Sequence, residues 1–240
     1  MTRELSKQAQ GVIASFRDIP YYNNKRQDIR FGLRARVGKG STQEILDEAR
    51  IYAMQEKVDW QNLSPEMRKK FLVDHKLGID CSAFAYYVLD AESQARNLGT
   101  LSSHLEFPFA NSIFSKLGRA LRNRYVENAD VRTFSHPSNS HEIKPGDIQP
   151  GDFLARMNPN DPNSRNHMMI VTKVSEVGPH QTIIVAHSEA RPEDGKYAHG
   201  VRTETLPRET LLAQHSLGDV GVEWGIHRLN WFTPNTVEGF

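Results

Sequence analysis

Apolar residues in the first third of the chain recur at helical spacing between clear helix-start signals. A loose helical period predicts a first helix over residues 3–16, and Pro20 ends it. Ser41 followed by Glu44 forms a capping-box pattern and predicts a helix through about residue 57. Ser64 followed by Pro65 predicts a shorter helix that ends near residue 75. The apolar contact surface of the second helix is expected at Ile45, Ala49, Ile51, Tyr52 and Met54.

A further helix is predicted within the sequence LGIDCSAFAYYVLDAESQA, residues 77–95, beginning after Asp80 and ending near Ala95. Asp80 is a favourable N-cap residue, and Phe84, Val88 and Ala91 then form an apolar stripe along the helix. Cys81, the only cysteine of the chain, therefore lies in the first turn of this helix.

The second half of the chain changes to short apolar segments broken by proline, glycine and asparagine. Residues 98–145 are interpreted as an insertion, with one helix near Asn111–Arg124 between polar loops. Helices followed by strands indicate a single α+β domain over residues 1–240, with residues 1–77 as a helical N-terminal elaboration and 148–231 as an antiparallel β-sheet half. Strands are predicted at residues 152–157, 167–174, 182–188, 201–206 and 223–231.

Composition supports a folded chain and limits its partners. Of 240 residues, 38% are hydrophobic and 25% are charged, which suits one substantial core. The apolar runs fall far short of the roughly 20 residues that a spanning helix needs, so no membrane span is expected. The N-terminus does not resemble a secretory signal, so we expect cytoplasmic synthesis, with a non-standard route of release left open.

Charge is nearly balanced over the chain but not along it. A net charge of +1 argues against nucleic acid as a partner of the whole surface. Residues 1–40 nevertheless hold nine lysines or arginines against three acids. This segment either contacts an anionic polymer or is simply a solvated basic face.

A single cysteine limits the chemistry that the chain can perform. It excludes an intramolecular disulfide and a cysteine-pair zinc site, and neither H-E-x-x-H nor G-x-S-x-G is present. A thiol reacts as thiolate, and an unperturbed cysteine has a pKa of about 8.5, so a nucleophilic cysteine needs a nearby cation or a helix N-terminus. Cys81 has the second of these by its position, and the same helix start could stabilise an oxyanion.

Two histidines are placed where they could serve such a thiol. His167 begins one predicted strand and His187 closes the next, so antiparallel pairing brings both to the same end of one hairpin. Whether both side chains share a face depends on a strand register that the pattern does not fix.

Four stretches resemble the NlpC-type papain-like cysteine peptidases, which cut bacterial cell-wall peptides. GIDCSAF at 78–84 resembles the D-C-S-G-F nucleophile motif, with Ala83 in place of the glycine. IQPGDFLARM at 148–157 resembles L-x-P-G-D-L, HMMIV at 167–171 resembles H-V-G-I-Y, and IIVAHSEA at 183–190 resembles the strand with the third catalytic residue. The resemblance implies a papain-like fold, in which a helical layer with the cysteine helix packs on an antiparallel sheet with the histidines.

Residue roles follow from the same resemblance. It implies that Cys81 is the nucleophile, His167 the base and His187 the group that orients the base, without a metal or organic cofactor. IPYY at 19–22 resembles the family's P-Y pair, so Tyr21 is a candidate for polarising the scissile carbonyl. Asp80 and Ser82 are candidates for support of the nucleophile or the oxyanion.

The resemblance implies hydrolysis of an amide bond, with a peptidoglycan stem peptide as substrate, through a thioester on the cysteine. Two alternatives stay open. One is an amidase or acyltransferase that uses the same residues on another acyl group. The other is a catalytically silent binding module that holds an anionic polymer through its basic N-terminal segment.

Overall fold

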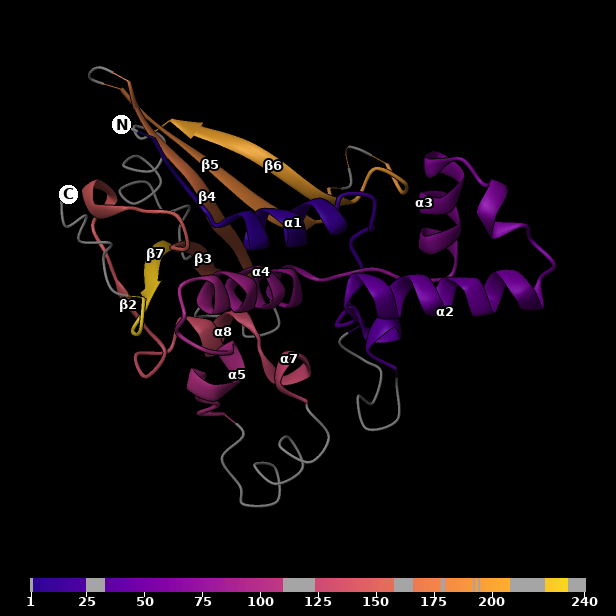
Figure 1. The fold of residues 1–240 in the computed structure, drawn as a ribbon, viewed down its shortest axis with the longest axis horizontal. Coiled ribbons are helices and arrows are strands. Elements are labelled where there is room, and N and C mark those ends of the chain that lie inside the picture. Colours follow the sequence, from indigo (N-terminus) through magenta and orange to yellow (C-terminus); the bar gives the residue numbers. More distant parts are fainter. Residues whose placement is uncertain are drawn as a thin grey trace.

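The computed structural model describes residues 2–24, 33–109, 124–157, 166–177, 180–191, 193, 195–207 and 223–232. Its architecture is mixed α+β, with helices packed on a seven-stranded antiparallel sheet (Figure 1). This confirms the predicted α+β class. The helix expected near Asn111–Arg124 falls, except for Arg124, on residues outside the described part of the chain.

The longer helices begin at the residues that the capping patterns indicate. Ser41 and Glu44 form the predicted capping box at the start of α2. Ser64 accepts a hydrogen bond from the amide of Met67 at the start of α3, and Pro65 occupies its first turn. The helices are α1 (Lys7–Ser15), α2 (Thr42–Gln55), α3 (Pro65–Asp74), α4 (Cys81–Ala95), α5 (Leu101–His104), α7 (Tyr125–Asn128) and α8 (Val131–Phe134), with 3-10 turns η1 (Arg34–Val37), η2 (Trp60–Asn62) and η3 (Pro145–Asp147).

The strands run β2-β7-β3-β4-β5-β6 across the sheet, all neighbours antiparallel. An additional strand, β1, pairs with the later part of β4. The strands are β1 (Thr2–Glu4), β2 (Ser140–Glu142), β3 (Phe153–Met157), β4 (His167–Val177), β5 (His180–Glu189), β6 (Gly200–Pro207) and β7 (Glu223–Leu229).

The first helix begins later than the apolar period predicts. Ser6 is its N-cap, and the Ser6 side chain accepts a hydrogen bond from the amide of Ala9. Residues 2–4 are therefore extended and pair with residues 173–175 of β4. The helical period could not reveal this, because the pairing depends on a strand about 170 residues away along the chain.

Two apolar clusters lie on the two faces of the sheet. The larger lies between the helices and the sheet, and includes Phe84 and Val88 of α4 with Phe153 of β3. The smaller contains Leu154 and Val171, whose side chains point away from that layer because successive strand residues face opposite sides. In the described part of the segment 98–145, seven buried residues join the larger cluster: Leu101, Leu105, Phe107, Val126, Ala129, Val131 and Phe134.

Several chain segments meet directly before α4. Ile79 forms a parallel bridge with Tyr21 and an antiparallel bridge with Lys39, and its carbonyl accepts a hydrogen bond from Ser188 Oγ at 2.8 Å. Gly78 permits this approach, since a Cβ there would lie 2.4 Å from the carbonyl oxygen of Pro20. These contacts fix the start of α4 against the end of β5.

Helices α2 and α3 extend to one side of the sheet, whereas α5, α7 and α8 lie together beside α4 (Figure 1). Among the described residues, no helix combines the length and apolar character needed to cross a lipid bilayer.

Candidate active site

Cys81 is the first residue of α4, as the capping pattern predicts. Asp80 Oδ1 accepts a hydrogen bond from the amide of Ala83 at 2.7 Å, which confirms Asp80 as the N-cap. The helix start places partial positive charge beside the sulfur, and its first-turn amides have no acceptor within the helix.

A buried lysine stabilises this helix start. Lys39 Nζ lies 2.9 Å from Asp80 Oδ2, and it donates to Ser82 Oγ at 2.7 Å and to the carbonyl oxygen of Ala129 at 3.0 Å. Ser82 Oγ in turn donates to Asp80 Oδ1 at 3.0 Å. We call Lys39, Asp80 and Ser82 the lysine cluster. Asp80 and Ser82 therefore hold the helix start on either side of Cys81 in the sequence.

Sequence reasoning did not identify Lys39 as part of the site. It lies about 40 residues before Cys81, in a stretch that also contains the exposed basic residues of the N-terminal segment. The local pattern distinguishes it from a solvated lysine only by its place between two glycines. Gly38 and Gly40 lie where the chain comes close to other backbone.

The Cys81 sulfur lies against the backbone at the start of β4. Sγ is 4.0 Å from the carbonyl oxygen of Asn166, and the amide of Met168 also points toward it. Because Asn166 and Met168 flank His167 along the chain, the sulfur lies next to the His167 backbone. Within the described residues, Cys81 makes no hydrogen bond to the His167 ring.

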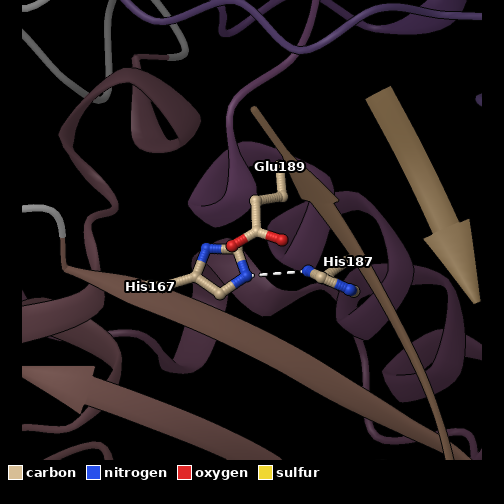
Figure 2. Close-up of side chains that lie close together, drawn as sticks. All are labelled: His167, His187 and Glu189. Carbon is tan, nitrogen blue, oxygen red and sulfur yellow. Dashed lines mark hydrogen bonds between the residues drawn. The ribbon is translucent and has the colours of Figure 1, made fainter. Parts of the chain in front are cut away.

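The two histidines contact each other directly. His167 Nε2 and His187 Nδ1 are 2.8 Å apart and share a hydrogen bond, with the rings nearly perpendicular (Figure 2). The β4–β5 register ends at Ile170 and Ala186, so the strands separate at the site, and the two rings meet across the gap. The predicted proximity of the two histidines at one end of the hairpin is therefore present.

Strand alternation places the His167 ring on a defined face. Met168 packs in the helix-side cluster, so His167 points to the other face, where its ring centroid lies 6.2 Å from that of Trp224. The sulfur therefore contacts the backbone on either side of His167, whereas the His167 ring points toward Trp224.

Burial favours the neutral forms of Cys81, His167 and His187. Desolvation raises the pKa of Cys81 to about 12, and Asp80 raises it further, against the opposing effects of the Met168 amide and of Lys39. Desolvation lowers the pKa of His167 to about 3, and the neighbouring His187 acts in the same direction. The pKa of His187 is also lowered by burial, against the attraction of Glu204 and Glu189. The structure thus holds a thiol and two neutral imidazoles.

A cleft of about 220 Å³ opens beside His167. Tyr21 and His167 both line it, which places the candidate tyrosine and the candidate base at one surface. Cys81 is only 6% exposed and is not one of the lining residues in the described part of the chain. The other lining residues are Asn23, Arg156, Asn166, Glu189 and Ala190.

Three of these side chains have the ligand types of a metal site. The ligand atoms of His167, His187 and Glu189 lie within 4.8 Å of one another (Figure 2). However, His167 Nε2 and His187 Nδ1 share a hydrogen bond, and Glu189 Oε2 accepts a hydrogen bond from Arg191 Nε at 2.7 Å. His167 Nε2, His187 Nδ1 and Glu189 Oε2 therefore already belong to hydrogen bonds within the protein.

No protein-family model, curated protein or solved structure matches the chain. Inferences about its function therefore rest on the geometry of the site and on the motif resemblance.

Proposed function

We propose that the chain is a papain-like cysteine hydrolase that cleaves an amide bond, with a peptidoglycan stem peptide as its substrate. The observation that carries the proposal is the position of the Cys81 sulfur. It lies at a helix start, against the backbone on both sides of His167, whose ring is hydrogen bonded to His187. This combination of thiol, imidazole and orienting group is what nucleophilic catalysis by cysteine requires.

In the proposed reaction, Cys81 Sγ attacks the carbonyl carbon while His167 Nδ1 takes the thiol proton. The amine then leaves with that proton, and water hydrolyses the resulting thioester. First-turn amides of α4 stabilise the oxyanion, although the amide of Ala83 is already bound by Asp80. Tyr21 lines the cleft beside His167, and in this scheme its hydroxyl polarises the scissile carbonyl.

The protonation states define when the thiolate forms. Because burial raises the Cys81 pKa to about 12 and lowers that of His167 to about 3, the thiol and the neutral imidazole are favoured at rest over the thiolate–imidazolium pair. The proton must therefore move as the carbon–sulfur bond forms. Catalysis in this scheme is general-base assisted attack by a thiol.

Cys81→Ala and His167→Ala variants test the proposal with purified muropeptides as substrate. We expect both to abolish release of new amino termini while the far-ultraviolet circular dichroism is retained. His141→Ala is the matched control, because His141 is exposed on β2 and remote from the sulfur. A Cys81→Ala variant as active as the parent protein would remove the nucleophile assignment.

Product analysis separates this hydrolase from an amidase or acyltransferase that uses the same residues. Mass spectrometry of the digested muropeptides locates the cleaved bond. A peptide bond within the stem supports the proposed substrate. A bond to the sugar, or transfer of the acyl group to an added amine, supports the alternative.

One observation favours the silent binding module as a second candidate. The Cys81 side chain is 6% exposed and its pKa is raised, as for an inert buried thiol. Labelling with iodoacetamide at pH 7 distinguishes the two. Labelling that His167→Ala slows further supports the hydrolase, because the imidazole then assists removal of the thiol proton; labelling at a rate unaffected by His167→Ala supports the binding module.

A further inference from the structure

A carboxylate stands beyond His187, on the side away from His167. Glu204 Oε1 lies 3.4 Å from His187 Nε2. Glu204 pairs with Val185, two residues before His187 on β5, so the two side chains share one face of the sheet. This carboxylate is absent from the residues that the motif resemblance identified.

The His187 nitrogen that faces Glu204 is buried and needs a partner. His187 is fully buried, and its Nε2 atom has no hydrogen bond of ordinary geometry within the described residues. The separation of 3.4 Å exceeds the usual N–H···O range of about 2.7–3.2 Å by only a few tenths of an ångström. A small shift of the Glu204 side chain would close the bond.

We propose that Glu204 is a positioning residue that fixes the tautomers of His187 and His167. The inference rests on the proposed function, because it concerns the nitrogen that acts as base. An ionised carboxylate only accepts hydrogen bonds, so Glu204 favours the His187 tautomer with its proton on Nε2. His187 Nδ1 then has a lone pair and accepts the proton of His167 Nε2 across 2.8 Å. The lone pair of His167 is thereby left on Nδ1, the nitrogen that must take the thiol proton.

The opposite tautomer would disable the base. A proton on His187 Nδ1 would point the Nε2 lone pair at the Glu204 carboxylate, which is repulsive. It would also make His187 the donor to His167 Nε2, and so place the His167 proton on Nδ1. His167 could then not accept a proton from Cys81.

Arg191 holds Glu204 in place. Its guanidinium donates to Glu204 Oε1 and, at 2.7 Å, to Glu189 Oε2, so one side chain links both acids near the histidines. The carbonyl oxygen of Arg191 accepts a hydrogen bond from His199 Nε2 at 2.9 Å, which holds the Arg191 backbone in place. Because a guanidinium only donates, an oxygen atom must remain at the Glu204 Oε1 position.

Long-range ¹H–¹⁵N correlation spectra of the histidine rings at pH 7 test the proposal in the full-length protein. In the parent protein we expect both His167 and His187 to carry their proton on Nε2. Glu204→Leu removes the acceptor at similar volume, and we expect His187 to populate the Nδ1–H tautomer. Glu204→Gln is the matched control, since Arg191 holds its amide oxygen where the carboxylate oxygen was, and it should keep the parent tautomers.

Hydrolysis provides the second readout. Glu204→Leu should lower kcat by at least about fivefold and by no more than the 10²–10⁴-fold that a general base contributes, whereas Glu204→Gln should retain most of the parent kcat. Nδ1–H tautomers in the parent protein, or unchanged tautomers in Glu204→Leu, would overturn the proposal. If Glu204→Leu does not fold, the parent spectrum and Glu204→Gln still decide.

The spectra do not depend on turnover, so the two ideas can fail separately. An active Cys81→Ala variant removes the proposed function but leaves the tautomer assignment intact. Conversely, a catalytic Cys81 with the wrong His187 tautomer removes only the role of Glu204.

Discussion

Replacement of Lys39 by methionine should destabilise the protein more than any change at an exposed ion pair. Lys39 is 8% exposed, and its ammonium group contacts Asp80, Ser82 and the carbonyl of Ala129. Methionine fills a similar volume but satisfies none of these groups. Asp80 would then remain as a buried carboxylate without its counter-charge, at the N-cap of the cysteine helix.

The expected loss follows from which groups are left without a partner. Removal of one member of a buried ion pair costs about 3–5 kcal/mol, because the other charge stays desolvated and unpaired. Two of the bonds lost with the ion pair, to Ser82 and to Ala129, act in the same direction. We therefore expect a loss of about 3–5 kcal/mol in the free energy of unfolding, measured by urea denaturation with circular dichroism.

Two further variants make this expectation specific. Lys173→Met makes the same substitution in an exposed pair with Glu4, where the two side chains are 36% and 43% exposed, and should change stability far less. Adding Asp80→Asn to Lys39→Met should recover part of the loss, since asparagine is neutral and still caps a helix. Equal effects of Lys39→Met and Lys173→Met, or a further loss in the double variant, would refute the buried-charge argument.

Three other changes test the fold around the site. Acidification from about pH 6.5 toward 3 should lower the free energy of unfolding by up to about 1.4 kcal/mol per pH unit through His167, because the unfolded imidazole binds a proton that the folded one excludes. His167→Gln should make the free energy of unfolding, measured by urea denaturation, depend less on pH, and an unchanged pH dependence would contradict this reasoning. Gly78→Ala should cost about 1–3 kcal/mol, since its Cβ would meet the backbone of Pro20, whereas Gly11→Ala in α1, with open space around it, should be neutral or slightly stabilising by thermal denaturation. Arg228→Met should cost about 3–5 kcal/mol by leaving the buried Asp152 carboxylate unpaired, and a smaller loss by urea titration would show that water reaches it.

Local signals predicted the elements around the site well. The capping box at Ser41 and the N-cap at Asp80 act over three residues, so they do not depend on the rest of the fold. The strands that carry His167 and His187 were indicated by their apolar runs, although both extend beyond the predicted ends. The same local rules failed where packing decides: Ile51 and Met54 were expected to be contact residues, yet they are 48% and 78% exposed.

Long-range contacts could not be predicted from the pattern. Lys39 reaches Asp80 because its segment bridges to Ile79, and Glu204 reaches His187 because β6 pairs with β5 in one particular register. Neither pairing leaves a periodic trace near the residue concerned. The face of the His167 ring was equally undetermined, since a shift of one residue in register would reverse it.

Two pairs of charged residues flank the buried thiol and the two histidines. Lys39 and Asp80 lie on the helix side of the sulfur, and Arg191 and Glu204 lie behind the histidines, so each pair of charges stays one contact away from the reacting atoms. Neither pair ionises the thiol at rest, because burial dominates its pKa. Their effect is to fix donors and acceptors: the helix start faces the sulfur, and the lone pair of His167 lies on Nδ1.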